Sequence, residues 1–188
     1  RFPIAGGGLG PPTRYLEAPQ ELRRGKAKNG LEAMTVMRGG PWKGAVIAVA
    51  ENFPDADGRH SGWLWVNGKP QRFALEETGG FDVTDIASLA DGTLLVLERR
   101  FRWLEGVKMR LRQVRAGDVA PGAVLSGEVL IQADMRFEID NMEGLAVHTG
   151  PAGETVLTIL SDDNYNPLLQ RTILHQFTLH PEALATGR

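Results

Sequence analysis

The chain has 188 residues, 42% of them hydrophobic, with no cysteine and a formal net charge of −2. This composition excludes disulfides, zinc–thiolate sites and thiol catalysis, and it favours a globular fold with a buried core. The small net charge predicts neither nucleic acid nor an anionic membrane as a charge-driven partner, and no apolar stretch approaches the ~20 residues of a membrane-spanning helix.

Strand patterns dominate the chain, and the one plausible helical stretch is PQELRR at 19–24. Three similar stretches follow it: NGLEAMTVMRGGPWKGAVIAVAENF (29–53), DVTDIASLADGTLLVLERRF (82–101) and DNMEGLAVHTGPAGETVLTILSDDN (140–164). Each begins with Asn or Asp, continues as a short strand and a Gly-containing turn, and ends in a β-rich strand. Further β-type segments come after each stretch, at 62–77, 107–136 and 170–179.

This repetition predicts an all-β fold of the β-propeller class. The spacing of the stretches suits four-stranded blades, for which repeats of about 40 to 50 residues before loop insertions are usual. We expect a single propeller fragment over residues 1–188, with about three four-stranded blades near 29–81, 82–139 and 140–180. Because closed propellers have about 4 to 8 blades, we expect half of a six-bladed ring that is closed by missing blades or by a second copy.

Each stretch carries an acid at its fourth position: Glu32, Asp85 and Glu143. Strand alternation places Glu32 on one face with Met34 and Val36, so we expect these acids beside an apolar row, where a carboxylate needs a partner. In one reading they bind Ca²⁺, and the candidate ligands are Glu32, Asp85, Glu143, Asn29, Asp140 and Asn141. In the other reading each acid accepts backbone hydrogen bonds and is structural.

A second polar cluster, SDDNYNP at 161–167, follows the strand ETVLTIL. It aligns with the ends of two earlier strands, which places Glu51, Glu98 and Asp162 at related positions. Asx side chains are typical of turns, but this cluster holds more of them than a turn requires, so we expect it to contribute to a site. In VKMRLRQVR (107–115), basic and apolar residues alternate, and we expect Lys108, Arg110 and Arg112 to face solvent.

The motifs NGLEAMTV, FDVTDIASLADGTLLVLERRF, DNMEGLAV and LTILSDDNYNPLLQRTILHQFTL resemble those of the esterase-like or phytase-like β-propeller proteins of bacteria, over residues 29–179. The resemblance implies a hydrolase of phosphoesters or carboxyl esters that uses Ca²⁺ held by carboxylates. It suggests Glu143, Asp162 and Asp163 as catalytic residues, and Arg99, Arg100 and Asn164 as contacts for a small-molecule ester or phosphoester. It also implies a periplasmic or secreted protein, with any signal peptide outside this sequence.

Two alternatives to this hydrolase stay open. A lactonase-like Ca²⁺ propeller would use the same types of oxygen ligand around one axial ion. A ligand-binding or scaffold propeller would use the three acids only to hold its blades together, because a fold does not by itself imply a chemistry.

Overall fold

The structure is a computed structural model that describes residues 4–5, 8–9, 11, 15–23, 30–166, 168, 170–180 and 182. It is almost entirely β-structure, as the sequence predicted, and the short helix α1 (Gln20–Arg23) coincides with the predicted helical stretch. The strands are β1 (Ile4–Ala5), β2 (Gly8–Leu9), β3 (Leu31–Val36), β4 (Val46–Pro54), β5 (His60–Val66), β6 (Lys69–Leu75), β7 (Asp82–Ser88), β8 (Leu94–Arg102), β9 (Gly106–Val114), β10 (Val124–Leu125), β11 (Glu128–Asp134), β12 (Met142–Thr149), β13 (Thr155–Ser161) and β14 (Leu174–Leu179).

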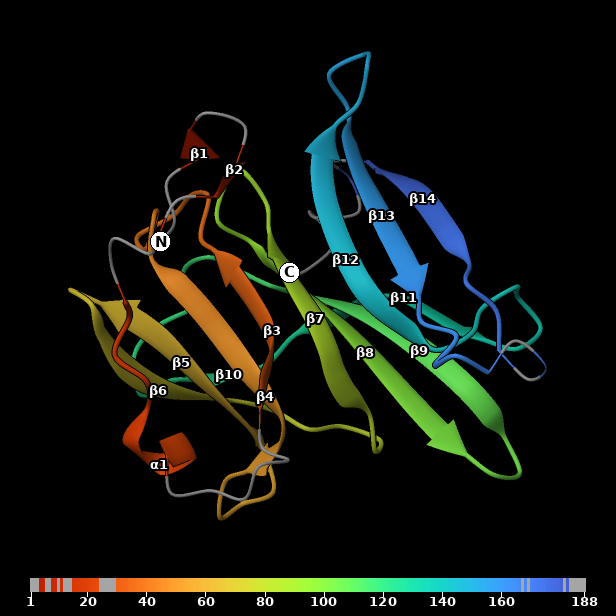
Figure 1. Cartoon of the computed structure of the whole chain (residues 1–188), viewed down its shortest axis with the longest axis horizontal. Helices are drawn as coiled ribbons and strands as arrows, with labels where there is room; N and C mark the ends of the chain where they lie inside the picture. Colours follow the sequence, from red (N-terminus) through yellow and green to blue (C-terminus); the bar gives the residue numbers. More distant parts are fainter. Residues whose placement is uncertain are drawn as a thin grey trace.

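Apart from the β1–β2 hairpin, the strands form three sheets (Figure 1). The first sheet has the order β10-β6-β5-β4-β3, the second β11-β9-β8-β7, and the third β12-β13-β14. Only the second sheet has the predicted four strands; the first gains β10, and the third has three strands in the described residues. The strands β3, β7 and β12 lie next to one another near the middle of the molecule, and each sheet extends outward from them.

Strand β10 joins the first sheet although it lies in the predicted second unit. It pairs parallel with β6, whereas every other pair of strands in the three sheets is antiparallel. The connection before it is fixed by the indole Nε1 of Trp42, which donates to the carbonyl of Val119 at 2.6 Å. The segment between β9 and β11 therefore ties the second unit to the outer edge of the first sheet.

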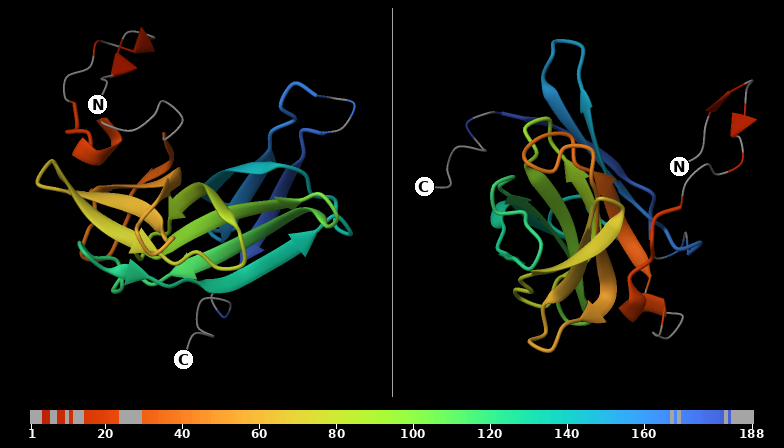
Figure 2. Two further views of the ribbon diagram at one scale, coloured as in Figure 1. Left: turned by 90° about the horizontal axis from the view of Figure 1, so that it is seen from below. Right: turned by 90° about the vertical axis from the view of Figure 1, so that its left-hand side faces the viewer.

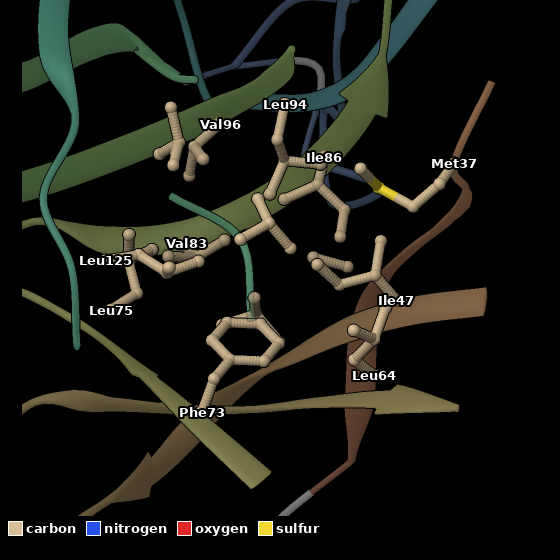
Figure 3. Close-up of a cluster of buried hydrophobic side chains, with 14 residues drawn as sticks. Met37, Ile47, Leu64, Phe73, Leu75, Val83, Ile86, Leu94, Val96 and Leu125 are labelled. Atoms are coloured by element: carbon tan, nitrogen blue, oxygen red, sulfur yellow. The ribbon is translucent and has the colours of Figure 1, made fainter. Parts of the chain in front are cut away.

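Two apolar cores separate the three sheets. The first core lies between the first and second sheets and contains Phe73 and Leu64 from one side and Val96 from the other (Figure 3). The second core lies between the second and third sheets and includes Leu97 and Ile159. Strand β7 has almost no exposed face because it contributes to both cores. The sheets thus stack face to face, and Figure 2 shows the layers from two further sides.

Each innermost strand carries a β-bulge near its start, where one residue has no partner on the neighbouring strand. The bulged residues are Glu32 in β3, Thr84 in β7 and Glu143 in β12. The structure therefore makes Thr84 the counterpart of Glu32 and Glu143, whereas the sequence comparison aligned Asp85 with them. A shift of one residue turns a side chain to the opposite face of a strand, so Asp85 points differently from the two glutamates.

The expectation that Glu32 lies beside a buried apolar row is also wrong. Met34 and Val36 are more than half exposed, whereas Ala33 and Met37, on the alternate face of the chain, are buried in the first core. In β3, the small alternate residues point to the second sheet. The larger ones lie on the outer face of the first sheet, because close packing against β7 favours small side chains there.

Two of the basic residues expected to face solvent are buried instead. Arg110 and Arg112 of β9 are 5% and 2% exposed, and both donate hydrogen bonds to Glu98 of β8, which is fully buried. Arg110 also stacks over the ring of Phe81 at 4.2 Å. The alternation of basic and apolar residues correctly placed both arginines on one face of β9. That face packs against the first sheet instead of facing solvent, so each buried charge needs an opposite partner.

Candidate active site at the ends of the inner strands

Glu51, Arg99 and Glu143 come together from three different sheets. Arg99 of β8 lies between the two acids: its Nη2 is 3.7 Å from Oε1 of Glu51 in β4, and its Nε is 3.4 Å from Oε1 of Glu143 in β12. All three side chains are partly buried. The Arg99 Nε atom is buried, and its contact with Glu143 is an ion pair without hydrogen-bond geometry.

Glu51 is the most perturbed acid of this cluster. Burial raises its pKa most, and Glu32, which lies within hydrogen-bonding range, raises it further through that bond and through its charge. Arg99 opposes the shift, yet the pKa of Glu51 rises to about 7 from its ordinary 4.5. At neutral pH, Glu51 is therefore present in both its protonated and its ionised form.

Glu143 is perturbed in the same direction by similar causes. Burial raises its pKa, and the charges of Glu32 and Asp162 add to this effect. The positive charge of Arg99 and a hydrogen bond from the Asn141 side chain act against it. We define the carboxylate–arginine cluster as Glu32, Glu51, Arg99, Asn141, Glu143 and Asp162.

A comparison with known protein families identifies the family of the chain. The family described as "Phytase-like: Esterase-like activity of phytase" matches residues 6–165. The chain belongs to this phytase-like family. A search of curated proteins finds no match for it.

One solved structure similar to this phytase-like chain is Sqt1 of Chaetomium thermophilum, crystallised with the N-terminus of a ribosomal protein. The two share 14% sequence identity with a TM-score of 0.39, and the match covers 81% of this chain. The chain spans 38% of the length of that protein. Within the described ranges, no helix has the length and hydrophobicity needed to cross a bilayer.

Asp85 and Asp140 of the phytase-like chain hold backbone groups rather than joining the cluster. Asp85 accepts hydrogen bonds from the backbone N–H groups of Leu145 at 2.7 Å and Ile86 at 2.8 Å. Burial raises the pKa of Asp85, and these two bonds oppose the rise. Asp140 likewise accepts from the backbone of Asn141 and Arg171. Acceptance of backbone hydrogen bonds is the role expected if these acids are structural. The bond from Leu145 to Asp85 links β7 to β12.

The polar segment after β13 is a set of Asx turns beside the cluster. The Asp162 carboxylate accepts from the backbone of Asn164, and the Asp163 carboxylate accepts from the backbone of Tyr165 and the hydroxyl of Thr172. The Asn164 side chain donates to Gln170. Asp162 is the member of this segment whose charge acts on Glu143. Asp163 and Asn164 serve the turn in this arrangement.

Arg100 lies on the opposite side of β8 from its neighbour Arg99. It donates to the carbonyl of Gly79 at 2.7 Å and to Glu105 at 2.7 Å, and it stacks over Phe81. Of the two arginines predicted to contact substrate, only Arg99 points into the cluster. Asn29 lies outside the described residues.

Sequence comparison did not select Glu51, although it placed this residue at a strand end. The residues just before the three bulges pair with Ala50, Glu98 and Ser161 on the neighbouring strands. Glu51, Arg99 and Asp162 directly follow these partners, so they occupy equivalent positions in the three sheets. The sequence comparison paired Glu51 with Glu98 instead, one residue out of register. A bulge changes register without a distinct sequence signal, so the convergence of Glu51 with Arg99 required the structure.

Proposed function

We propose that the carboxylate–arginine cluster is an ester-hydrolase site in which Glu51 is the general acid and base. The observation that carries the proposal is the position of Glu51, a partly buried carboxyl group 3.7 Å from the Arg99 guanidinium, where burial and the neighbouring Glu32 raise its pKa to about 7. A carboxyl group whose pKa lies near the working pH can both accept and return a proton, and such a group commonly contributes 10²–10⁴-fold to a rate. Membership of the phytase-like family supports ester hydrolysis as the reaction class.

Each step of the proposed reaction has a group to perform it. Ionised Glu51 removes a proton from a water molecule as the water oxygen bonds to the ester carbonyl carbon. The Arg99 guanidinium provides positive charge for the oxyanion that forms. The bond between the carbonyl carbon and the alcohol oxygen then breaks, and protonated Glu51 returns its proton to the leaving alcohol. Glu143 orients Arg99 through its contact with Nε, on the same edge of the guanidinium as the Nη2 contact with Glu51.

The charge balance of the cluster favours a carboxyl ester over a phosphoester. Four carboxyl groups, those of Glu32, Glu51, Glu143 and Asp162, surround one cation, Arg99. A phosphate monoester brings about two further negative charges, which this surplus repels. A neutral carboxyl ester meets no such repulsion, so we propose small carboxyl esters as the substrate class.

Calcium binding stays a proposal for the same cluster. A bound Ca²⁺ would offset the negative charge of the carboxyl groups, and the cluster would then no longer repel a phosphoester. In the present arrangement the fit is poor. Arg99 occupies the space between Glu51 and Glu143, and the described residues contain no group of three or more His, Cys, Asp or Glu side chains able to hold a metal. We therefore assign no step of the reaction to a metal ion.

The architecture around the site is also part of the proposal. We propose that the three sheets are blades of a propeller-like array, since their innermost strands are neighbours and their outer strands follow in order. On this proposal, missing blades or a second copy close the ring, and the protein is exported, as the resemblance implied. A closed ring would place Glu51, Arg99 and Glu143 around its axis.

Hydrolysis of p-nitrophenyl acetate and of p-nitrophenyl phosphate, each with calcium and with a chelator, tests the proposed function. We expect release of p-nitrophenol from the acetate that is unaffected by chelation and exceeds release from the phosphate. Hydrolysis of the phosphate alone, and only with calcium, would replace the proposed substrate class. Absence of hydrolysis under all four conditions would leave the cluster with a structural or ligand-binding role.

A further inference from the structure

Large apolar side chains are exposed at one end of the second sheet. Trp103 and Leu104, in the turn between β8 and β9, are 87% and 94% exposed. Phe101 precedes them on β8, and Met135 and Phe137 follow the end of β11; all three are more than half exposed. A protein of this size ordinarily buries such residues, and an exposed group of them marks a contact surface.

The two turns that carry these residues are neighbours. Strand β11 pairs with β9 up to Asp134, which lies opposite Lys108, so both turns project from the same end of the sheet (Figure 2, left). Met135 lies directly over Gly106, where the added Cβ of any other residue would collide with the Met135 sulfur. We call Phe101, Trp103, Leu104, Met135 and Phe137 the apolar tip.

Cationic side chains surround the apolar tip. Arg100, Arg102 and Lys108 all bond to one carboxylate, Glu105, and Arg136 pairs with Asp134. Four cations therefore share two acids in these contacts, although the whole chain has a net charge of −2. Arg102 and Arg136 are the most exposed of the four. With the exposed Glu138, which directly follows Phe137, four cations face three acids, so the part of the molecule where the apolar residues project has a local excess of one positive charge.

We infer that the apolar tip inserts into the surface of an anionic lipid membrane. Trp, Phe, Leu and Met side chains on projecting turns enter the boundary between headgroups and acyl chains, and surrounding arginines and lysines attract anionic headgroups. A projecting tip matches a fluid surface, which deforms around it, better than it matches a flat protein interface. Arg99 lies two residues before Phe101 on β8, so membrane binding brings the carboxylate–arginine cluster close to the lipid surface.

Tryptophan fluorescence with lipid vesicles tests this inference in the 188-residue chain. Trp63 and Trp65 are buried and Trp42 is half-buried, so Trp103 is the strongly exposed tryptophan. On adding vesicles of phosphatidylcholine with phosphatidylglycerol, we expect its emission to shift to shorter wavelength and to be quenched by lipids that carry a quencher in the acyl chain. Cosedimentation with the same vesicles gives the affinity.

Variants of exposed residues separate insertion from adventitious adsorption. Leu104→Ser, which keeps the fluorophore, should weaken vesicle binding by about tenfold or more, because one buried leucine is lost. The control Tyr15→Ser, at an exposed position outside the tip, should leave binding unchanged. Arg102→Gln with Arg136→Gln should weaken binding to the anionic vesicles by several-fold and have little effect on pure phosphatidylcholine.

Three results would overturn the inference. They are the absence of a Trp103 shift with anionic vesicles, equal binding by Leu104→Ser and Tyr15→Ser, and self-association through the tip in lipid-free solution without vesicle binding. The last would assign the tip to a second copy of the chain. None of these measurements depends on hydrolysis, so the proposed function and this inference fail separately.

Discussion

Arg112 donates from Nε and Nη2 to the two carboxylate oxygens of Glu98, at 2.9 and 2.5 Å, on the face of the second sheet that meets the first. Its Nη2 also donates to the backbone carbonyl of Glu76, in the segment that leads from the first sheet to the second. Arg110 adds a bond of 2.6 Å to the same carboxylate. This buried group joins the second sheet to the segment that connects it with the first, by directed bonds that add to the apolar contacts of the first core.

Glu98→Gln should destabilise the protein by about 3–5 kcal/mol, because it leaves Arg110 and Arg112 buried without an opposite charge. Urea unfolding followed by circular dichroism measures the loss. The matched control is Asp134→Asn, which removes the exposed pair with Arg136 and should cost about 0–1 kcal/mol. Similar losses in the two variants would show that burial does not determine the contribution of these pairs.

Glu51→Gln should lower the turnover of a carboxyl ester by about 10²-fold or more, because glutamine neither accepts nor returns the proton. The pH–rate profile of the wild type should bend near pH 7, and this bend should be absent from the residual activity of the variant. Glu21→Gln, on α1, is a control of the same chemical change at an exposed position. A profile without a bend near neutrality would remove Glu51 from the proposed role.

The contribution of Glu51 to stability should fall as the pH rises from about 5 to 7. The pKa of Glu51 is raised in the folded protein, so the folded state binds more protons than the unfolded state in this window. The contribution of Glu51 is complete below its unfolded pKa of 4.5 and is lost as the pH passes its folded pKa of about 7. Glu143 and Asp85 act in the same direction, because their pKa values are also raised.

Denaturant unfolding at several pH values, for the wild type and Glu51→Gln, measures this dependence. Burial lowers the pKa of His60, so His60 adds stability as the pH rises through the same window and opposes Glu51. The variant has no titrating group at position 51, so its free energy of unfolding should fall less, or rise more, than that of the wild type. The same pH dependence in both proteins would contradict the raised pKa of Glu51.

Gly92→Ala should destabilise the protein by about 2 kcal/mol or more. Gly92 has a φ of +95°, and an added Cβ would lie 2.6 Å from the backbone carbon of Gly39, where turns from two sheets meet. Gly153→Ala provides the comparison, since Gly153 has a φ of +86° with no neighbouring atom within 4 Å. That variant should show only the cost of the backbone conformation, about 1 kcal/mol. Thermal unfolding of both variants separates collision from backbone strain.

Calcium, if it binds the cluster, must compete with the guanidinium of Arg99. Arg99→Gln should therefore bind Ca²⁺ about tenfold more tightly than the wild type, because Glu32, Glu51 and Glu143 then lack a cation. Isothermal titration calorimetry measures both affinities, and Arg99→Gln combined with Glu143→Gln should lose the gain. Equal affinities, or no binding by Arg99→Gln, would rule against a calcium site at this position.

The all-β class, the three repeated stretches and the position of the short helix could be predicted from the sequence. These features depend on local alternation, β-branched residues and turn residues, which are readable along the chain. Among the candidate site residues named from the sequence, Glu143, Asp162 and Arg99 lie in the carboxylate–arginine cluster. The family resemblance that the sequence suggested is confirmed by the family match over residues 6–165.

Which polar residues meet could be learned only from the packing of the three sheets. Bulges at Glu32, Thr84 and Glu143 shift the register by one residue, which removes Asp85 from the cluster and brings in Glu51. Stacking of the sheets decided that Arg110 and Arg112 are buried, although their alternation resembles that of a solvent-facing strand. Alternation specifies that two faces of a strand differ, but only the packing of neighbouring sheets specifies which face is buried and which charges are thereby forced together.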